Sequence, residues 1–252
     1  MVKSFNKPSP IGGDPVDHCE VGGVSEVLID ARALPLEEVN AKIREAVAKG
    51  VKARIRNAEG IHGLAAGICQ GEVEVEGDVG DYAAMLIGKR EHKEGGGAGP
   101  RIVINGGAGA YLADNAWAGE VVVKGSVGDY AGVYSYGGAI VIHEGAGNGV
   151  GQLLKGATIV VNGSVGDGVG LYMVGGTIVI IGNAGEALGD WMIRGEIFIA
   201  GGYKSLGNNA QEADLTEQDE ERLKTLLSKY DMNVSVEKFK KITPVKVRPF
   251  YG

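Results

Sequence analysis

Cysteine is scarce in this sequence, and nothing in it indicates a disulfide or zinc framework. The two cysteines, Cys19 and Cys69, do not form a CxxC pair. His18 precedes Cys19, but no second ligand pair lies nearby in the sequence, so we predict no zinc site there. The amino-terminal residues MVKSFNKPSPIGG contain no apolar stretch typical of a signal peptide. We therefore expect a protein of a reducing compartment, the cytoplasm.

Long hydrophobic runs and an excess of basic residues are also missing. No stretch of the chain approaches the roughly 18 uninterrupted apolar residues of a membrane-spanning helix. The 32 acidic residues outnumber the 25 lysines and arginines, and the formal net charge is −7. Nucleic acids and anionic membranes both select proteins with a basic face. The charge balance therefore argues against either as the main partner.

Motifs for nucleotide binding and nucleophilic catalysis are absent as well. Despite its many glycines the chain has no GxGxxG string, and the letters GKR from Gly88 to Arg90 do not complete a P-loop. A serine hydrolase would need GxSxG, whereas the nearest strings, GSVG around Ser126 and around Ser164, lack that spacing. We therefore predict no catalytic, cofactor-binding or metal-binding residue in this chain.

Glycine, in contrast, is abundant and recurs at a fixed period. Two columns repeat every nineteen residues: Gly109, Gly128, Gly147, Gly166 and Gly185, and Gly132, Gly151, Gly170 and Gly189. Short alternating segments rich in β-branched residues begin at the same interval, at Ile102, Val121, Ile140, Ile159, Ile178 and Ile197. One strand per period predicts coils that stack on one another. The predicted fold is an all-β repeat, a single-stranded right-handed parallel β-helix of about seven coils with flanking helices.

Side-chain alternation predicts which residues fill the core. The first and third residues of each strand should point inward, as Ile140 and Ile142 illustrate. A third inward column lies on the return part of each coil and contains Leu112, Ala131, Val150, Val169 and Leu188. Three apolar columns enclose a narrow core, so Ile140 should lie directly between Val121 and Ile159.

The chain divides into three segments. Residues 1–50 form a lead-in with a strand at 26–30 and a helix from Pro35, at its first position, to Lys49. Residues 51–202 form the coils. Residues 203–252 form a carboxy-terminal helix with a capping-box start at Thr216 and Asp219, followed by an extended tail from Phe239. A glycine-rich insertion at 88–99 is interpreted either as a binding loop or as a plain mobile loop.

Polar residues that recur at the turns are interpreted as structural. Asp81, Asp129, Asp167 and Glu186 follow turn glycines, and Asn148 occupies the same column. Because asparagine replaces aspartate in this column, hydrogen bonds to nearby backbone amides explain it better than a metal or acid–base array. His62 is expected to make a turn or interface hydrogen bond, and His143 to lie in a solvated row.

One outward-facing column is more apolar than a solvent-exposed sheet surface requires. The central residues of the strands form an apolar stripe, the valine stripe, made of Val103, Val122, Val141, Val160, Val179 and Phe198. An apolar stripe of this length should be covered. Two covers are open: a terminal segment of the same chain, or a partner protein for which the valine stripe would be the docking surface.

The coil motif resembles a known family. The segments from Gly125 to Gly132 and from Gly163 to Gly170 resemble the GXGXG β-helix that forms the carboxy-terminal domain of the glutamate synthase large (alpha) subunit. The lead-in also resembles that family, at the letters IDAR ending at Arg32, EVN ending at Asn40, and Arg56 with Asn57. Where the family usually has arginine three residues after this asparagine, the present chain has Gly60. The same coil motif occurs in one of the subunits of formylmethanofuran dehydrogenase, but the lead-in favours glutamate synthase.

The resemblance implies a role without chemistry of its own. In glutamate synthase the β-helix accompanies an amidotransferase with an amino-terminal cysteine nucleophile and a barrel that carries FMN and an iron–sulfur cluster. Neither part has a counterpart in this sequence. We therefore expect a non-catalytic subunit that binds no cofactor and assembles with an amidotransferase chain and an FMN-barrel chain. A formylmethanofuran dehydrogenase scaffold, a stand-alone binding module, an esterase and a homo-oligomer remain alternatives.

Overall fold

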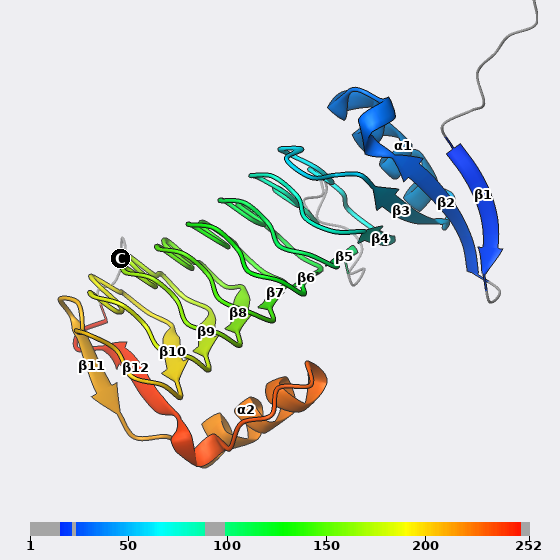
Figure 1. Ribbon diagram of the computed structural model, residues 1–252. Helices are drawn as coiled ribbons and strands as arrows, with labels where there is room; N and C mark the ends of the chain where they lie inside the picture. The colour runs from blue at the N-terminus through cyan, green and yellow to red at the C-terminus, as the bar shows by residue number, and fades with distance from the viewer. Residues whose placement is uncertain (1–15, 22–23, 89–98, 248–252) are drawn as a thin grey trace, which may run out of the picture.

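The computed structural model describes residues 16–21, 24–88 and 99–247, and their strands belong to one continuous sheet (Figure 1). The twelve strands of these ranges follow the order β1-β2-β3-β4-β5-β6-β7-β8-β9-β10-β12-β11. The strands are β1 (Val16–Val21), β2 (Val24–Asp30), β3 (Lys52–Arg56), β4 (Glu72–Val75), β5 (Arg101–Ile104), β6 (Glu120–Val123), β7 (Ala139–Ile142), β8 (Thr158–Val161), β9 (Thr177–Ile180), β10 (Glu196–Ile199), β11 (Ala210–Ala213) and β12 (Lys240–Pro244). The helices are α1 (Leu36–Ala48), α2 (Glu217–Lys229) and the short 3-10 turns η1 (Ala31–Ala33) and η2 (Val236–Lys238).

The strands from β2 to β10 pair in parallel, each with its neighbours along the chain, which is the arrangement of a β-helix of about seven coils. Ile140 pairs with Val121 on one side and Ile159 on the other, so the predicted nineteen-residue stacking is confirmed. The step from Glu72 to its partner Arg101 is longer than the others. The insertion predicted at 88–99 accounts for that step, and its residues 89–98 lie outside the described ranges.

The core consists of the predicted inward columns. In β7, Ile140 and Ile142 are buried and belong to the main apolar cluster. Their counterparts in the neighbouring coils are buried in the same cluster. The return column of Leu112, Ala131, Val150, Val169 and Leu188 is also buried, with no side chain more than 1% exposed. Burying each large aliphatic side chain contributes roughly 1.5–3 kcal/mol, so these three columns provide most of the driving force for coil stacking.

Glycine is required where coils approach closely. Gly132 and Gly151 have φ of +70° and +64°, a conformation that side chains with a Cβ adopt only with strain. A Cβ on Gly132 would lie 2.6 Å from Cδ1 of Ile159, inside the core. On Gly128, from the other glycine column, it would lie 2.8 Å from the backbone nitrogen of Ala110 in the preceding coil. The two columns found in the sequence therefore have different causes. In the Gly132 column a Cβ would crowd the core from a left-handed backbone, and in the Gly128 column it would meet the backbone or the turn aspartate or asparagine of the preceding coil.

Both ends of the coil stack are closed. At the amino-terminal end α1 buries Val39, Ile43 and Val47 against the first strands, and β1 adds an antiparallel edge to β2. Pro35 precedes α1 as its N-cap, with ψ of 151°, rather than occupying the first helical position as predicted. At the other end β12 pairs antiparallel with β10, and β11 with β12. Within the described residues the edges of the sheet are therefore β1 and β11, and the strands of the first and last coils are paired on both sides.

Neither described helix could serve as a membrane span. Within the residues placed by the structure, no helix is long and apolar enough to cross a bilayer.

Candidate functional site

The valine stripe is the first surface to consider, because the sequence singled it out as a docking surface. Its six residues are paired in register from Val103 in β5 to Phe198 in β10. Val122, Val141, Val160, Val179 and Phe198 are buried, and Val103, at the end of the row, is partly buried. A cover is therefore present over almost the whole stripe.

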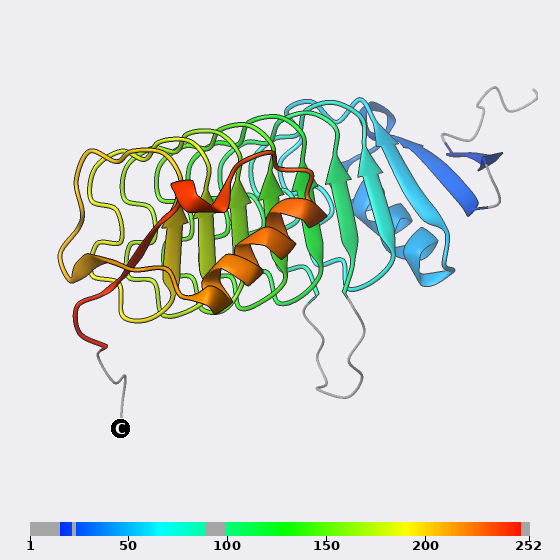
Figure 2. The same cartoon turned by 90° about the horizontal axis from the view of Figure 1, so that it is seen from below.

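The cover belongs to the same chain. The stripe forms an apolar cluster with side chains of α2 and of the segment that follows it, namely Leu223, Leu227, Tyr230, Met232, Val236 and Phe239. Figure 2 shows α2 lying across the outer face of the strands from β6 to β10. Because its own chain occupies the valine stripe, the stripe is not free to be the partner-docking surface that the sequence offered as the other possibility. Of the two covers left open by the sequence, the structure contains the intramolecular one.

Ion pairs hold the amino-terminal end of α2 against β10 and β12. Asp219 is 4% exposed, and its Oδ2 accepts hydrogen bonds from Nζ of Lys241 at 2.8 Å and from the hydroxyl of Thr216 at 2.8 Å. Arg222 donates to Asp219 and pairs with Glu196 of β10. Burial alone would raise the pKa of Asp219, but the hydrogen bonds from Lys241 and Thr216 outweigh it and lower the pKa to about 2. The predicted capping box is thus present and is also tied to the coils.

A second polar contact fixes the other end of α2. Nζ of Lys229 and the hydroxyl of Tyr230 donate to Oε1 of Glu120, in β6, at 2.8 and 2.9 Å. Burial acts to raise the pKa of the Glu120 carboxyl, but the hydrogen bonds from Lys229 and Tyr230 lower it below its usual value. The helix therefore runs from β10 back to β6, with one polar attachment at each end.

Beyond the helix the same outward column becomes charged. Arg54 in β3 and Glu74 in β4 occupy the positions that valines occupy from β5 onward. Arg54 pairs with Glu76 at 2.7 Å, and Lys52 pairs with Glu74. The apolar residues thus coincide with the footprint of the cover, and the part of the sheet outside it carries partly exposed ion pairs.

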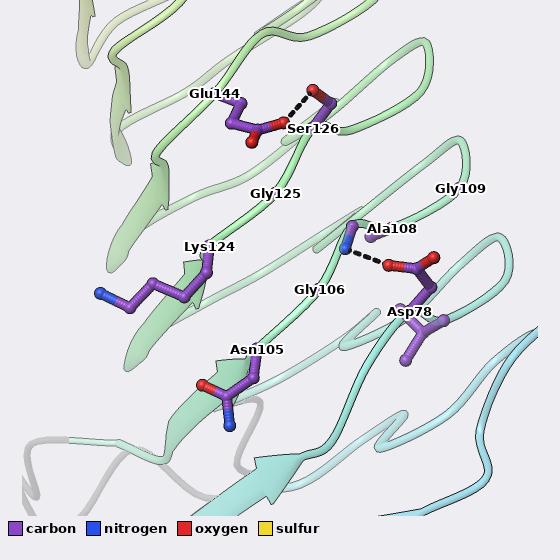
Figure 3. Close-up of a pocket in the computed structure, with 11 residues that line it drawn as sticks. Asp78, Asn105, Gly106, Ala108, Gly109, Lys124, Gly125, Ser126 and Glu144 are labelled. Atoms are coloured by element: carbon purple, nitrogen blue, oxygen red, sulfur yellow. Dashed lines mark hydrogen bonds between the residues drawn. The ribbon is translucent and has the colours of Figure 1, made fainter.

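A polar groove of about 700 Å³ lies at the glycine-rich corner after the strands (Figure 3). Asp78, Asn105 and Lys124 line it together with Ser126 and Glu144. The hydroxyl of Ser126 donates to Oε2 of Glu144 at 2.8 Å, and Oδ1 of Asp78 accepts from the backbone N–H of Gly107 at 2.7 Å. Ser126 is the serine of one GSVG string, and its partner in the described chain is this carboxylate rather than a histidine. The geometry therefore provides no Ser–His pair for nucleophilic catalysis in the groove.

The carboxylates and the asparagine of the turn column bind backbone, but across coils rather than within one turn. Oδ1 of Asp129 accepts from the N–H of Asn148 at 2.6 Å, and Oδ1 of Asn148 accepts from that of Asp167 at 2.9 Å. Asp167 does the same for Glu186 at 2.7 Å. A metal ion at this column would compete for oxygens already engaged by amides. The structural role is as predicted, but each hydrogen bond reaches the next coil.

The isolated histidines agree in part with the structural roles predicted for them. His62 precedes Asp81 in the turn column, and its Nδ1 accepts from the backbone N–H of Asp81 at 2.9 Å. His143 is only partly exposed, and its Nε2 lies 3.2 Å from Nζ of Lys124. His18 and Cys19 lie in β1, where side chains are outside the described part of the structure. Among the side chains that are described, no group of three or more His, Cys, Asp or Glu residues is arranged to hold a metal ion.

A second surface, which we call the aromatic face, was not predicted. It consists of aromatic side chains on the turn segments of successive coils: Tyr82, Tyr111, Tyr130, Trp117, Tyr134, Tyr136, Tyr172 and Trp191. Tyr111 stacks between Tyr82 and Tyr130, with ring centroids 4.8 and 5.0 Å away, and Trp117 stacks on Tyr136 at 4.3 Å. The nineteen-residue spacing of Tyr111 with Tyr130 and of Trp117 with Tyr136 was a signal that could have revealed it.

The aromatic face is unusual in its exposure. Six of its members are large aromatic side chains at least 37% exposed: Tyr82, Trp117, Tyr134, Tyr136, Tyr172 and Trp191. Tyrosine and tryptophan are enriched in the energetically important parts of protein interfaces, because each offers a large rigid surface with a polar handle. The aromatic face is therefore exposed in the described part of the structure, whereas the valine stripe is buried.

Comparison with protein-family models finds none that matches the chain, and no curated protein matches it significantly.

Proposed function

We propose that this chain is a non-catalytic assembly subunit of a cytoplasmic glutamate synthase-type complex. In this complex separate chains hydrolyse glutamine and carry out the FMN-dependent reductive amination of 2-oxoglutarate to glutamate. FMN and the iron–sulfur cluster belong to the FMN-barrel chain. The β-helix holds that chain and the amidotransferase chain in position.

The observation that carries the proposal is a hydrogen-bonded junction between the lead-in and the first coil. Asp30 ends β2, and its two carboxylate oxygens accept from Nδ2 of Asn57 at 3.1 and 3.0 Å. Nε of Arg56 and the backbone N–H of Arg32 donate to the same carboxylate at 3.1 and 3.2 Å. The hydrogen bond from Asn57 is the main cause that lowers the pKa of Asp30. These are the residues on which the resemblance to the glutamate synthase lead-in depends.

Asn40, from the second lead-in segment, makes an equally specific contact. It lies in α1 and is 7% exposed. Its Nδ2 donates to the carbonyl of Gly63 at 3.0 Å, and its Oδ1 accepts from the N–H of Ala65 at 2.8 Å. A side-chain amide is one of the few groups that can satisfy a buried carbonyl and a buried N–H together. The letters shared with the family thus have a common structural task, which a β-helix with another lead-in would not require.

The aromatic face supports an assembly role. A chain that acts alone has no need for six exposed tyrosines and tryptophans on one series of turns, whereas a scaffold subunit needs a rigid surface that partners can bind. The stacked rings are fixed by coils whose spacing is set by backbone hydrogen bonds. Little conformational entropy would be lost when a partner binds them.

The proposal is tested by purifying the tagged chain from the organism that encodes it and identifying the proteins that accompany it. We expect an amidotransferase chain and a second chain with stoichiometric flavin and iron, measured by absorbance and metal analysis. The complex should form glutamate from glutamine and 2-oxoglutarate, and removing the tagged chain should reduce that activity. An untagged extract taken through the same columns is the control.

Two outcomes would contradict the proposal in different ways. Partners containing molybdenum or tungsten with a pterin would instead identify a formylmethanofuran dehydrogenase-like scaffold. Recovery of the chain alone, with no stoichiometric partner under mild conditions, would favour a stand-alone binding module.

A further inference from the structure

A groove of about 420 Å³ crosses three consecutive coils within the aromatic face. Tyr111, Asp114 and Asn115 line it from one coil, and Tyr130 and Tyr134 from the next. Val133, Gln152 and Leu153 complete the lining. The groove thus combines three tyrosines, one carboxylate and two side-chain amides in an open depression large enough for a single side chain of a bound polypeptide.

Asp114 is the distinctive residue of this groove. It is only partly exposed, and its Oδ1 accepts a hydrogen bond from Nδ2 of Asn115 at 2.8 Å. Burial raises the pKa of its carboxyl, against the opposing effect of the hydrogen bonds from Asn115. Within the described parts of the chain no lysine, arginine or histidine forms an ion pair with it. A desolvated carboxylate with a neutral partner gains most from a cation delivered by a ligand.

The tyrosines next to Asp114 already bind one cation of this chain. Nζ of Lys155 lies 5.4 Å from the ring centroid of Tyr134 and 4.2 Å from that of Tyr136, and it donates to the hydroxyl of Tyr136 at 2.6 Å. Lys155 comes from the coil that follows Tyr134, whereas Asp114 comes from the coil before it. The ring of Tyr134, 41% exposed, therefore contacts a cation from the following coil and lines the same groove as the carboxylate of the preceding coil.

The surroundings of the groove also favour a positive ligand. The turn column beside the tyrosines contributes the carboxyl groups of Asp81, Asp129 and Asp167, and one oxygen of each accepts a backbone hydrogen bond. The whole chain carries a formal net charge of −7. A basic partner would thus be attracted to this face at long range and oriented at short range.

We propose that the Asp114–Tyr134 groove binds the guanidinium group of an arginine presented by a partner polypeptide. Guanidinium is planar, so it can lie against a tyrosine ring while its parallel N–H groups pair with the carboxylate. A lysine ammonium is a compact, strongly hydrated point charge and matches this combination less well. The inference deepens the assembly role proposed above and rests on it only for the identity of the chain that supplies the arginine.

The test uses the purified full-length chain and two fluorescent pentapeptides, acetyl-Gly-Gly-X-Gly-Gly-amide, in which X is arginine or citrulline. Citrulline has nearly the shape of arginine without its charge. We expect saturable binding of the arginine peptide, measured by fluorescence anisotropy at low ionic strength, and at least tenfold weaker binding of the citrulline peptide. Asp114→Asn should weaken binding of the arginine peptide at least tenfold, and Tyr134→Leu severalfold.

Asp190→Asn is the matched control. Asp190 occupies the column of Asp114 four coils further along, but its Oδ1 already accepts from the backbone N–H and the side-chain amide of Asn208 at 2.7 and 2.9 Å. The Asp190→Asn variant should leave binding of the arginine peptide unchanged, and thermal melting should confirm that all variants are folded. Equal affinity for the two peptides, no binding of either, or equal effects of Asp114→Asn and Asp190→Asn would overturn the inference. Because no partner chain takes part, the peptide result is separate from the outcome of co-purification.

Discussion

Truncating Leu223 to alanine should loosen the cover of the valine stripe. The Leu223 side chain is fully buried in the cluster between α2 and the strands. Large-to-small changes of this kind cost about 2–5 kcal/mol. Because α2 has 13 residues, and isolated helices shorter than ~12–15 residues are marginal in water, the helix depends on this packing. The loss should therefore appear mainly as local opening of α2.

Hydrogen–deuterium exchange measures that opening directly. At a factor of ten per 1.4 kcal/mol, backbone amides of α2 in Leu223→Ala should exchange roughly 30-fold to 4,000-fold faster than in the parent. Amides of β3 and β4, which lie outside the footprint of the helix, should change little. Lys224→Ala, at the neighbouring exposed position, is the control and should stay within about 0.5 kcal/mol of the parent. Unchanged α2 exchange in Leu223→Ala, or equal acceleration in both variants, would refute apolar packing as what holds the cover.

Three further predictions concern charge, glycine and the junction. Because the folded pKa of Asp219 is about 2, below its ordinary value of 3.8, ionised Asp219 stabilises the fold above about pH 4, and this contribution is lost as pH falls toward 2. In urea denaturation at pH 7, the free energy of unfolding of Asp219→Asn should be about 2 kcal/mol below that of the parent, and the difference should shrink at low pH. A difference that does not change with pH would exclude this link between Asp219 ionisation and stability. Gly151→Ala should lower the melting temperature more than Gly168→Ala. Both glycines have positive φ, but a Cβ at Gly151 would lie 2.5 Å from an isoleucine methyl, whereas a Cβ at Gly168 would meet open space. Asn40→Ala should cost about 1–3 kcal/mol in chemical denaturation by leaving the N–H of Ala65 without its partner, and a neutral result would show that water replaces the amide.

The parts of the fold that repeat could be predicted from the sequence, because every coil supplies an independent copy of the same signal. The columns through Ile140 and Gly132 are of this kind, and the stacking they predict is what the structure contains. The strands β1 and β11 escaped prediction because they occur once and lie outside the period. Their positions depend on pairing with a neighbouring strand, β2 and β12, rather than on local sequence.

The candidate site shows the limits of the same reasoning. An apolar row on a strand indicates that something covers Val141, but an amphipathic helix in the same chain and a groove on another protein satisfy that requirement equally. The choice depended on whether α2 could reach β6, which is a matter of chain path and of polar contacts such as Lys229 with Glu120. The aromatic face was overlooked for a different reason. Its tyrosines vary with leucine and asparagine in the same columns, as at Asn115, Tyr134 and Leu153, so the period is visible only when the coils are aligned.

The position of the cover in the chain has a consequence for synthesis. Phe198 and the valines before it leave the ribosome before Leu223, and the last residue of the cover, Phe239, is about forty residues behind Phe198. At ~5–20 residues per second the completed stripe therefore stays bare for roughly 2–8 s in every nascent chain, together with the unpaired outer edge of β10. Exposed valines beside an open strand edge favour aggregation. Coils that end at residue 202 would remain in this state permanently. The segment from α2 to Phe239 therefore acts as an intramolecular chaperone for the coils that precede it.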